Sequence, residues 1–380
     1  MTKTVYFVIG EESGDLLGAD LIDGLETIAD LEAQYVGLAG HAMQKRGMRS
    51  LFEIEGIAVM GFSAVIARLP TIIRRVHQVV ADIVAKKPDI IVLIDSPDFT
   101  HAVAKRVRKK LPSVPIVDYV CPSVWAWRSG RAKTMRAYID HVLAILPFEP
   151  KVLAQLDGPP ATYVGHRLAR HVAALPEHKA AHNSVTQLLV LPGSRRGEIE
   201  RLLPAFGETV ELLRQRGHEF ETTLAAVPRH RALIERHTAT WSAAPTIVSS
   251  EENDTTFAHV DVALAASGTV ALELALHGVP MVTGYKLDPV ARPFASLVTT
   301  WSALLPNLIA DRLIVPEEIN ELVLPGRLAR HIEELMLDGP ARRRQLDGFT
   351  DVRLAMETKT PPGERAASVV FDMLRGETPS

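Results

Sequence analysis

The sequence predicts an α/β protein with two doubly wound domains, each a parallel sheet covered by helices. Two observations predict this class. Short apolar runs alternate with helical stretches along most of the chain, which is typical of parallel sheets. The chain also has 380 residues, more than one typical core supports. We expect domains at residues 1–166 and 185–345, followed by C-terminal helices at 346–380.

The apolar runs indicate buried strands because they do not alternate with polar residues. In the first domain the predicted strands are Val5–Ile9, Gln34–Leu38, Ile90–Ile94, Ile116–Tyr119, His141–Ile145 and Thr162–Val164. A polar, histidine-rich linker is expected at His166–Ser184. The pattern then restarts with Leu188–Leu191, Glu221–Ala225, Thr246–Val248, Val260–Ala265 and Pro280–Val282. The charged tail after Leu324 is predicted to be helical.

The bulk composition excludes several classes of protein. The chain is 47% hydrophobic and 23% charged, which is ordinary for a globular protein. A net charge of −3 argues against non-specific nucleic-acid binding. The single cysteine, Cys121, excludes an intramolecular disulfide and suits a reducing compartment. No signal peptide and no uncharged run of about 18 residues is visible, so we expect a soluble or membrane-surface protein.

The first strand is followed by the acidic stretch GEESGD, residues 10–15, which we expect to form a turn before a helix starting near Leu16. Ligands of open α/β sheets gather over such turns. Three carboxylates would repel a phosphate, however, and the stretch has neither the GxGxxG pattern nor the lysine of a P-loop. We therefore expect it to face a ligand other than the nucleotide.

Asp95 stands at the carboxyl end of the predicted strand Ile90–Ile94, and Pro97 ends that strand. A carboxylate at this position can act as a general base. The alternative is that Asp95 caps the next helix. Asp98 suits the cap better because it is nearer the helix start, which leaves Asp95 for chemistry.

Two turns of the second domain have the features of anion sites. Gly193, Ser194 and Arg195 combine free N–H groups, a helix N-terminus and a cation. Ser267, Gly268 and Thr269 offer hydroxyl and backbone donors, and Glu273 can accept from ribose hydroxyls. The alternatives are an exposed basic turn and an ordinary capped helix. Together the turns suggest that a nucleotide binds in this domain.

Two further stretches are open to either interpretation. The loop holding Ser123 and Trp125 carries two tryptophans within three residues, and these can contact a sugar or simply pack. The segment from Gly56 to Arg75 is densely apolar and ends in arginines. It can lie on a membrane surface or form an ordinary core helix.

The chain resembles the lipid-A-disaccharide synthase family from about Val5 to Leu337. The resemblance is carried, in order, by GEESGD, AVMGF, IDSPDF, PSVWAWR, LAILPFE, GH, LPGSRRGEI, ASGTVALELAL, PMVTGY and LPNLIA. It implies a GT-B fold, with the two domains facing across a cleft and the last helices crossing back onto the first domain. It also implies an inverting glycosyltransferase that joins UDP-2,3-diacylglucosamine to 2,3-diacylglucosamine 1-phosphate in lipid A biosynthesis. The expected location is the cytoplasmic face of the bacterial inner membrane, and a homodimer is compatible with it.

The resemblance also assigns roles to residues. Asp95 matches the family's general base, Arg195 its diphosphate-binding arginine and Asn307 another required residue. Ser267, Gly268, Thr269 and Glu273 match its nucleotide turn. The residues expected to contact the acceptor or hold its loops are Glu12, Ser13, Asp15, Met60, Phe62, Ser123, Trp125 and His166. No DxD motif follows a strand, so we expect no cofactor and no metal, with arginine and helix N-termini in the metal's place.

Three residues depart from the family pattern without touching the expected base or diphosphate site. Arg167 and Arg170 follow Gly165-His166 where small and acidic residues are usual, and Asn320 stands near a usual glutamine. Two other functions use similar folds: a UDP-N-acetylglucosamine 2-epimerase and a nucleotide-sugar-binding protein without turnover. The epimerase has no need of an apolar, arginine-flanked segment.

Overall fold

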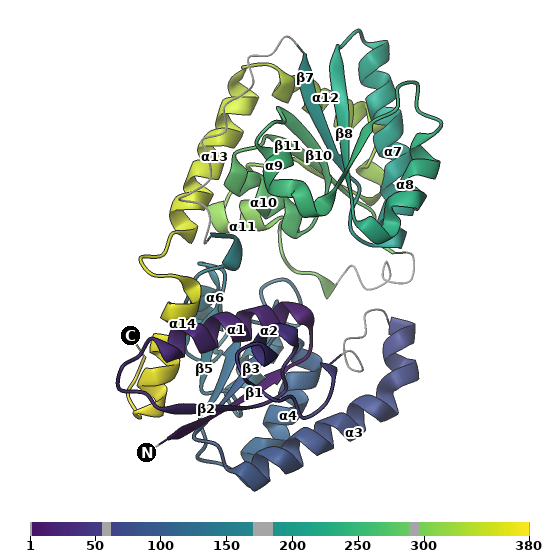
Figure 1. The fold of residues 1–380 in the computed structure, drawn as a ribbon. Helices are drawn as coiled ribbons and strands as arrows, with labels where there is room; N and C mark the ends of the chain where they lie inside the picture. The colour runs from purple at the N-terminus through teal and green to yellow at the C-terminus, as the bar shows by residue number, and fades with distance from the viewer. Residues whose placement is uncertain (1, 55–61, 170–184, 289–296, 380) are drawn as a thin grey trace. The chain divides into compact units, whose positions relative to one another are not determined.

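A computed structural model describes residues 2–54, 62–169, 185–288 and 297–379 (Figure 1). The chain divides into two compact units. Unit 1 comprises Met1–Arg170 with Thr358–Ser380, and unit 2 comprises His171–Glu357. Each unit contains a six-stranded sheet in which every pairing is parallel, with helices packed on it. The predicted α/β class with two doubly wound domains is confirmed.

The sheet of unit 1 has the order β2-β1-β3-β4-β5-β6. Its strands are β1 (Lys3–Ile9), β2 (Ala33–Gly37), β3 (Ile90–Ile94), β4 (Ile116–Tyr119), β5 (His141–Ala144) and β6 (Ala161–Tyr163). All residues of β3, β4 and β5 are buried, which explains why these strands are mostly apolar. The chain order reverses between neighbours β1 and β3, and ligands of open sheets bind at such a switch point.

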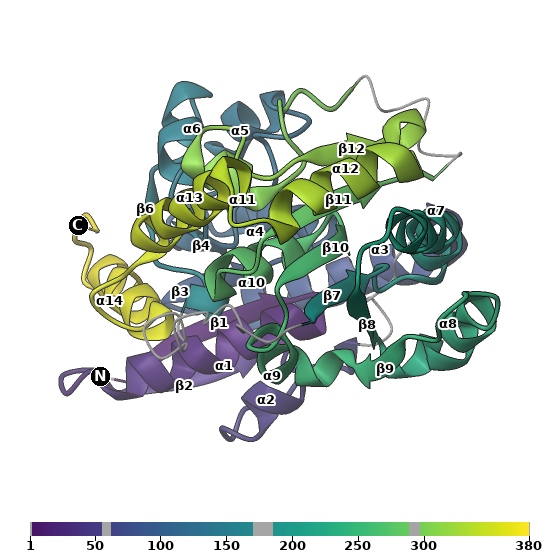
Figure 2. The same cartoon turned by 90° about the horizontal axis from the view of Figure 1, so that it is seen from above.

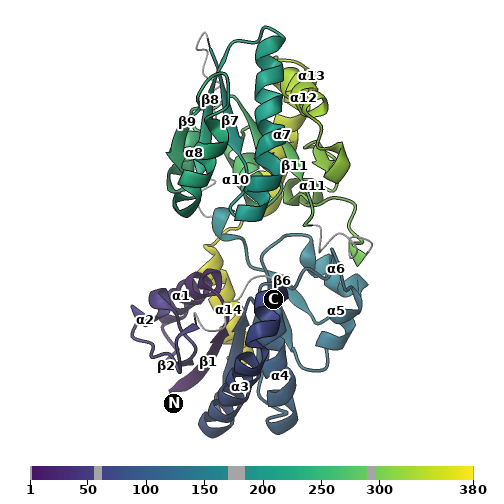
Figure 3. The same ribbon diagram turned by 90° about the vertical axis from the view of Figure 1, so that its right-hand side faces the viewer.

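The helices of unit 1 come from both ends of the chain. They are α1 (Glu12–Glu26), α2 (His41–Gln44), α3 (Phe62–Lys86), α4 (Pro97–Lys110), α5 (Gly130–Met135), α6 (Glu149–Gln155) and α14 (Pro362–Leu374). Right-handed crossovers place α1 on one face of the sheet and α3 and α4 on the other, because the chain changes direction at β2. The returning α14 packs along α1, as Figures 1 and 3 show, and adds apolar side chains to this core.

The contact between α1 and α14 depends on two glycines. A Cβ atom on Gly24 would lie 2.5 Å from the carbonyl oxygen of Gly363, and one on Gly363 would lie 2.4 Å from that of Asp20. Any side chain here would force the helices apart. The C-terminal residues are thus divided between the units: residues 340–356 form α13 of unit 2, whereas α14 packs in unit 1.

Unit 2 has the order β12-β11-β10-β7-β8-β9, and β7 and β10 meet at its switch point. Its strands, which Figure 2 labels, are β7 (Thr186–Leu191), β8 (Phe220–Ala226), β9 (Thr246–Ser249), β10 (Val262–Ala266), β11 (Met281–Tyr285) and β12 (Glu317–Ile319). The short β12 was not predicted. The α-helices are α7 (Arg196–Gln215), α8 (Arg231–Thr238), α9 (Asn253–Phe257), α10 (Thr269–His277), α11 (Leu305–Ala310), α12 (Pro325–Met336) and α13 (Pro340–Met356). Helix α12 packs with α7, and α13 packs with α10 and α11.

Candidate active site

In unit 1 the chain segments after β1 and β3 lie against each other because two glycines let their backbones approach. A Cβ atom on Gly10 would stand 2.4 Å from the Cβ of Ser96, which is closer than real side chains come. A Cβ atom on Gly14 would stand 3.2 Å from the carbonyl oxygen of Ile94. These glycines therefore bring the start of α1 to the end of β3, at the switch point of the sheet.

The acidic stretch is mostly helical, and the prediction of a turn over all six residues is wrong. Helix α1 begins at Glu12, and its first turn contains both Glu12 and Asp15. Acidic side chains are stabilising there because a helix N-terminus carries partial positive charge. Glu12 and Ser13 are exposed and can meet a ligand.

Asp15 holds the polypeptide backbone rather than facing a ligand. Its side chain is 2% exposed, and its carboxylate accepts hydrogen bonds from three backbone N–H groups at 2.6–3.1 Å. The donors are Gly40, Ala42 and Met43. Of the two roles expected for this residue, contact with the acceptor or support of the loop, the geometry supports only the second.

Asp95 follows β3 in an unusual backbone conformation. Its φ is 57° and that of Ser96 is 43°, so two consecutive non-glycine residues are left-handed. Such residues cost about 1–3 kcal/mol each and cluster at functional sites. The half-buried carboxylate accepts from the hydroxyl of Ser13 at 3.0 Å and from the N–H of Ser96 at 2.7 Å. A carboxylate has about four lone-pair positions, so it can still accept a substrate hydroxyl.

Neither candidate carboxylate caps α4. The N-cap is Ser96, which makes no side-chain capping bond. Asp98 lies inside the first turn and pairs with Nη2 of Arg131 at 2.9 Å. The prediction that Asp98 is the cap is therefore wrong, and the alternative role of Asp95 as the cap is not realised either.

The loop after β4 begins beside Asp95, whose N–H donates to the carbonyl of Tyr119 at 3.1 Å. The next residue, Val120, has a φ of 82°, which is strained for a β-branched side chain. Ser123 is exposed. The ring of Trp125 packs edge-on against Phe148, with the two ring centroids 5.4 Å apart.

The carboxylate of Glu149 connects this loop to the chain segment after β5 through hydrogen bonds. Its Oε1 accepts from Nε1 of Trp125 at 3.3 Å. Its Oε2 accepts from the N–H groups of Ile145 and Leu146 at 3.1 and 3.0 Å. Burial raises the pKa of Glu149 to about 7, against the opposing effect of these hydrogen bonds. The loop position thus depends on a buried carboxyl group.

His166 follows β6, and its Nδ1 accepts from the N–H of Leu168 at 3.1 Å. Burial lowers its pKa to about 4, so the ring is neutral at pH 7. The neighbouring Arg167 lies 3.5 Å from Oδ2 of Asp20 on α1. This unusual arginine therefore has its partner inside unit 1.

The structure does not test the remaining predictions for unit 1. Met60 and Arg170 lie outside the described residues. Phe62 is the first residue of α3, but its side chain is also outside the description.

In unit 2 the turn after β7 places Arg195 directly before α7. Gly193 has a φ of 106°, which glycine adopts without strain. Nη1 of Arg195 donates to Oε1 of Glu198 at 2.9 Å, and the Arg195 side chain is 62% exposed. The turn therefore contains the predicted arginine, but that arginine is already paired with a carboxylate.

The turn after β10 lies next to this one because β7 and β10 are paired neighbours. Gly268 and Thr269 are exposed, and the first N–H groups of α10 have no partner within the helix. The N–H of Ser267 donates to the carbonyl of Gly284 at 3.1 Å, so it is not available to a ligand. Burial raises the pKa of Glu273, whereas its hydrogen bond with Asn253 opposes this rise. The two turns therefore lie side by side at one edge of the sheet.

Asn307, predicted as catalytic, is a structural residue here. Its side chain is fully buried in α11. Its Nδ2 donates to Oγ of Ser302 and the carbonyl of Val315, and its Oδ1 accepts from the N–H groups of Ile314 and Val315, all at 2.9–3.2 Å. Because all these amide positions are filled, Asn307 holds the chain around α11 and cannot contact a substrate in this conformation.

Arg229 is a further candidate residue beside the turn after β7, and it was not among the predicted site residues. It lies in the short 3₁₀ helix Pro228–His230, directly after β8. Its Nη2 donates to the carbonyl of Ser194 at 3.4 Å, so it adjoins the turn that holds Arg195. A cation shortly after a predicted strand is the signal that could have identified it.

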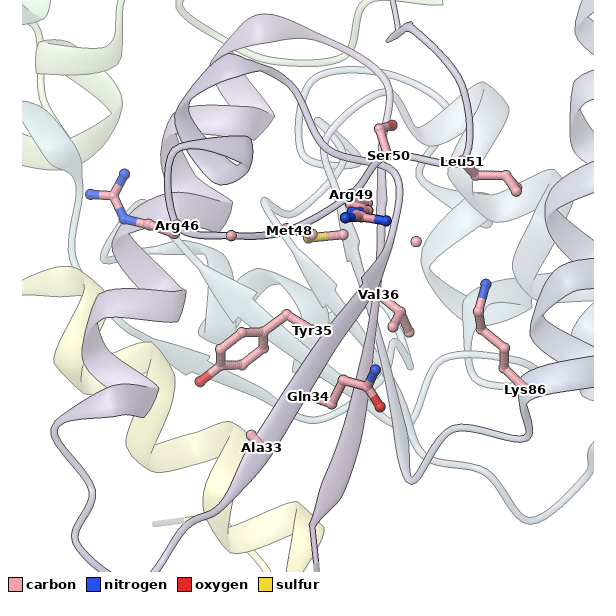
Figure 4. Close-up of a pocket in the computed structure, with 12 residues that line it drawn as sticks. Ala33, Gln34, Tyr35, Val36, Arg46, Met48, Arg49, Ser50, Leu51 and Lys86 are labelled. Carbon is pink, nitrogen blue, oxygen red and sulfur yellow. The ribbon is translucent and has the colours of Figure 1, made fainter.

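A separate hollow of about 680 Å³ lies along the edge strand β2 (Figure 4). Tyr35, Arg46, Arg49 and Lys86 are among the residues that line it. Arg46 is paired with Asp23, and Lys86 with Asp82. Neither Asp95 nor Ser13 lines this hollow, so it is distinct from the candidate base.

Two features are absent from the part of the chain that the structure describes. No helix there is long and apolar enough to cross a membrane. No group of three or more histidine, cysteine or acidic residues there could hold a metal ion.

Comparisons with known proteins agree over nearly the whole chain. A family model described as lipid-A-disaccharide synthetase matches residues 5–366. The lipid-A-disaccharide synthase of Rhodopseudomonas palustris (strain ATCC BAA-98 / CGA009) is 44% identical over 381 residues, covering 98% of this chain and 97% of the relative. That of Bradyrhizobium diazoefficiens is 40% identical over 380 residues, with coverages of 98% and 97%.

Solved structures give the same fold at low identity. The S. aureus MnaA–UDP co-structure has a TM-score of 0.64 and 14% identity, and covers 100% of this chain and 99% of that one. MurG of Acinetobacter baumannii has a TM-score of 0.57 and 13% identity, with coverages of 98% and 99%. At such identities these likenesses establish only the fold.

Proposed function

We infer the chemistry of this chain from its membership of a family: it belongs to the lipid-A-disaccharide synthases and is a glycosyltransferase that forms the lipid A disaccharide. We propose that its donor is UDP-2,3-diacylglucosamine and its acceptor 2,3-diacylglucosamine 1-phosphate. The products are then the β-1,6-linked disaccharide 1-phosphate and UDP.

Asp95 is the proposed general base. Its carboxylate takes the proton from the 6-hydroxyl of the acceptor, and the hydroxyl oxygen then attacks C1 of the donor sugar. The bond between C1 and the diphosphate oxygen breaks, and UDP leaves with the bonding electrons. The observation that carries this role is the left-handed Asp95 at the β1/β3 switch point, oriented by Ser13 and by the N–H of Ser96.

Unit 2 is the proposed donor-binding unit. The leaving diphosphate gains negative charge in the transition state, so fixed donors and cations aimed at it lower the barrier. The N-termini of α7 and α10, with Arg195, provide such groups at one edge of the sheet. Gly193, Ser194, Ser267, Gly268 and Thr269 form the two turns, and Glu273 is the proposed ribose acceptor.

The experiment is a purified-enzyme assay of UDP release with both acylated sugars and no added metal. Asp95→Asn keeps the size of the side chain but removes the base, so turnover should fall by about 10²- to 10⁴-fold. Circular dichroism should show the wild-type fold. Full turnover by Asp95→Asn would remove Asp95 from the mechanism. Conversion of UDP-N-acetylglucosamine without any acceptor would instead indicate an epimerase.

We also propose that α3 contacts the inner-membrane surface where the acylated substrates reside. Leu69 and Ile73 are 48% and 46% exposed, and lie four residues apart on one face of the helix. The exposed Arg74 is adjacent and can meet anionic headgroups. Farther along, Val76, Val79, Val80 and Ile83 are buried in the core of unit 1. The C-terminal half of α3 is thus anchored in the core, while Leu69 and Ile73 before it are exposed.

A further inference from the structure

The arginines around the turn after β7 differ in whether a carboxylate neutralises them. Arg195 pairs with Glu198 at 2.9 Å, and Arg196 with Glu200 at 2.8 Å. Arg201 lies 3.2 Å from Asp288. Each of these guanidinium groups has a carboxylate at contact distance, so together they add little net positive charge to the turn.

Glu198 occupies the turn itself. Its Oε2 would lie 2.9 Å from a Cβ atom placed on Gly193, and the N–H of Arg195 points toward the same oxygen at 3.4 Å. A diphosphate at Gly193–Arg195 therefore meets a carboxylate as well as an arginine. The Arg195–Glu198 pair has no net charge, so a further cation would strengthen the attraction of this turn for the ligand.

Arg229 is that cation. It follows β8, which pairs in parallel with β7, so both strands end at the same edge of the sheet. Its guanidinium donates to two groups that are not carboxylates: the carbonyl of Ser194 at 3.4 Å and Nε2 of His230 at 3.3 Å. Within the described ranges no carboxylate pairs with Arg229, whose side chain is exposed. Three of its five N–H donors remain for a ligand.

We propose that Arg229 binds the diphosphate of the nucleotide at the Gly193–Arg195 turn and supplies the net positive charge there. Guanidinium groups suit phosphate oxygens because they donate two parallel, charge-assisted hydrogen bonds. The hydrogen bond to Ser194 sets Arg229 beside the turn before the ligand arrives. This inference rests on the proposed function, in which unit 2 binds UDP.

The test is calorimetric titration of the full chain with UDP, UMP and uridine. Hydrogen bonds to charged groups predict that Arg229→Ala weakens UDP binding by about ten- to a hundred-fold. The same substitution should weaken the binding of UMP less, and it should leave the binding of uridine unchanged. Arg229→Lys should recover part of the loss, because lysine keeps the charge but not the planar pair of donors.

Arg231→Ala is the matched control. This exposed arginine is two residues away, on α8, and its Nε pairs with Glu235 at 2.9 Å. The Arg231→Ala variant should bind UDP with the affinity of the wild type. If Arg229→Ala also does so, or if uridine weakens as much as UDP, Arg229 does not bind phosphate and the proposal is overturned. Wild-type protein that binds no UDP would overturn the proposed donor site as well, which separates the two failures.

Discussion

The hydroxyl of Ser13 donates a 3.0 Å hydrogen bond to Oδ2 of Asp95, joining two residues 82 positions apart in the sequence. The bond exists because β1 and β3 are parallel neighbours, and Gly10 and Gly14 let α1 start close to the end of β3. One carboxylate oxygen is thereby fixed by the first turn of α1, and the other by the N–H of Ser96. The GEESGD stretch thus positions the proposed base.

Ser13→Ala should lower turnover without unfolding the protein. The loss of a hydrogen bond to a charged group is worth about 1.5 kcal/mol at the lower end, or about ten-fold in rate. We expect the decrease to be in kcat, which is measured as the rate of UDP release at saturating acceptor. Ser113→Ala is the control, because it makes the same chemical change in an exposed loop before β4. Equal kcat in the two variants would show that Asp95 needs no help from Ser13.

The sequence was sufficient to predict every described strand except the short β12, and the position of Asp95, because buried parallel strands form largely apolar runs. The runs ending at Ile9, Ile94, Leu191 and Ala265 mark the carboxyl ends of four strands, where ligands of such sheets bind. The sequence did not reveal which polar side chains form hydrogen bonds within the protein and are therefore unavailable to a ligand. Asp15 and Asn307 are residue types common in active sites, but each is occupied by backbone N–H groups, such as those of Gly40 for Asp15 and Ile314 for Asn307.

Long-range contacts explain the other differences. Arg229 adjoins the turn at Ser194 only because β8 lies beside β7, and no local pattern links residues 35 positions apart. Similarly, α14 packs with α1 through Gly24 and Gly363, which lie near opposite ends of the chain. Helical periodicity identifies such a helix without showing where it packs.

Asn307→Ala should destabilise unit 2. The change removes a fully buried amide and leaves the N–H groups of Ile314 and Val315 without their acceptor. Each unsatisfied buried group costs about 1–3 kcal/mol, so the free energy of unfolding, measured in urea, should fall by several kcal/mol. A variant with wild-type stability but no turnover would restore Asn307 to the catalytic residues.

Glu149→Gln should remove a pH dependence of stability. Burial raises the pKa of Glu149 from 4.5 to about 7, so between these values the folded state holds a proton that the unfolded state has lost. The contribution of Glu149 to stability therefore falls as pH rises from 4.5 to about 7, by about 3 kcal/mol at roughly 1.4 kcal/mol per pKa unit.

The measurement is urea unfolding of both proteins from pH 5 to pH 8. His141 and His166, whose pKa values burial lowers to about 4, act in the opposite direction and are common to both proteins. The difference between wild type and variant therefore isolates Glu149. A difference that stays constant with pH would mean that Glu149 is ionised throughout.

Gly24→Ala should weaken the packing of α14 on α1. The new Cβ would meet the carbonyl oxygen of Gly363 at 2.5 Å, and neither group can rotate away because both belong to helix backbones. Overpacking of this kind costs about 1–3 kcal/mol, which exceeds the gain of about 1 kcal/mol in helix propensity. Gly326→Ala in α12 adds the same methyl group in open space and should be neutral or stabilising. Equal thermal stability of the two variants would contradict the tight helix contact.

Serine at both Leu69 and Ile73 should reduce the binding of the protein to vesicles that contain anionic phospholipid. Full burial of one such side chain contributes about 1.5–3 kcal/mol, so losing two partly buried ones should weaken binding at least ten-fold. Co-sedimentation over a lipid titration measures this effect, and turnover of detergent-dispersed substrates should be retained. Leu354→Ser, on the exposed surface of α13, is the control for a general loss of apolar surface. If the double variant sediments like this control and the wild type, α3 does not contact the membrane through this face.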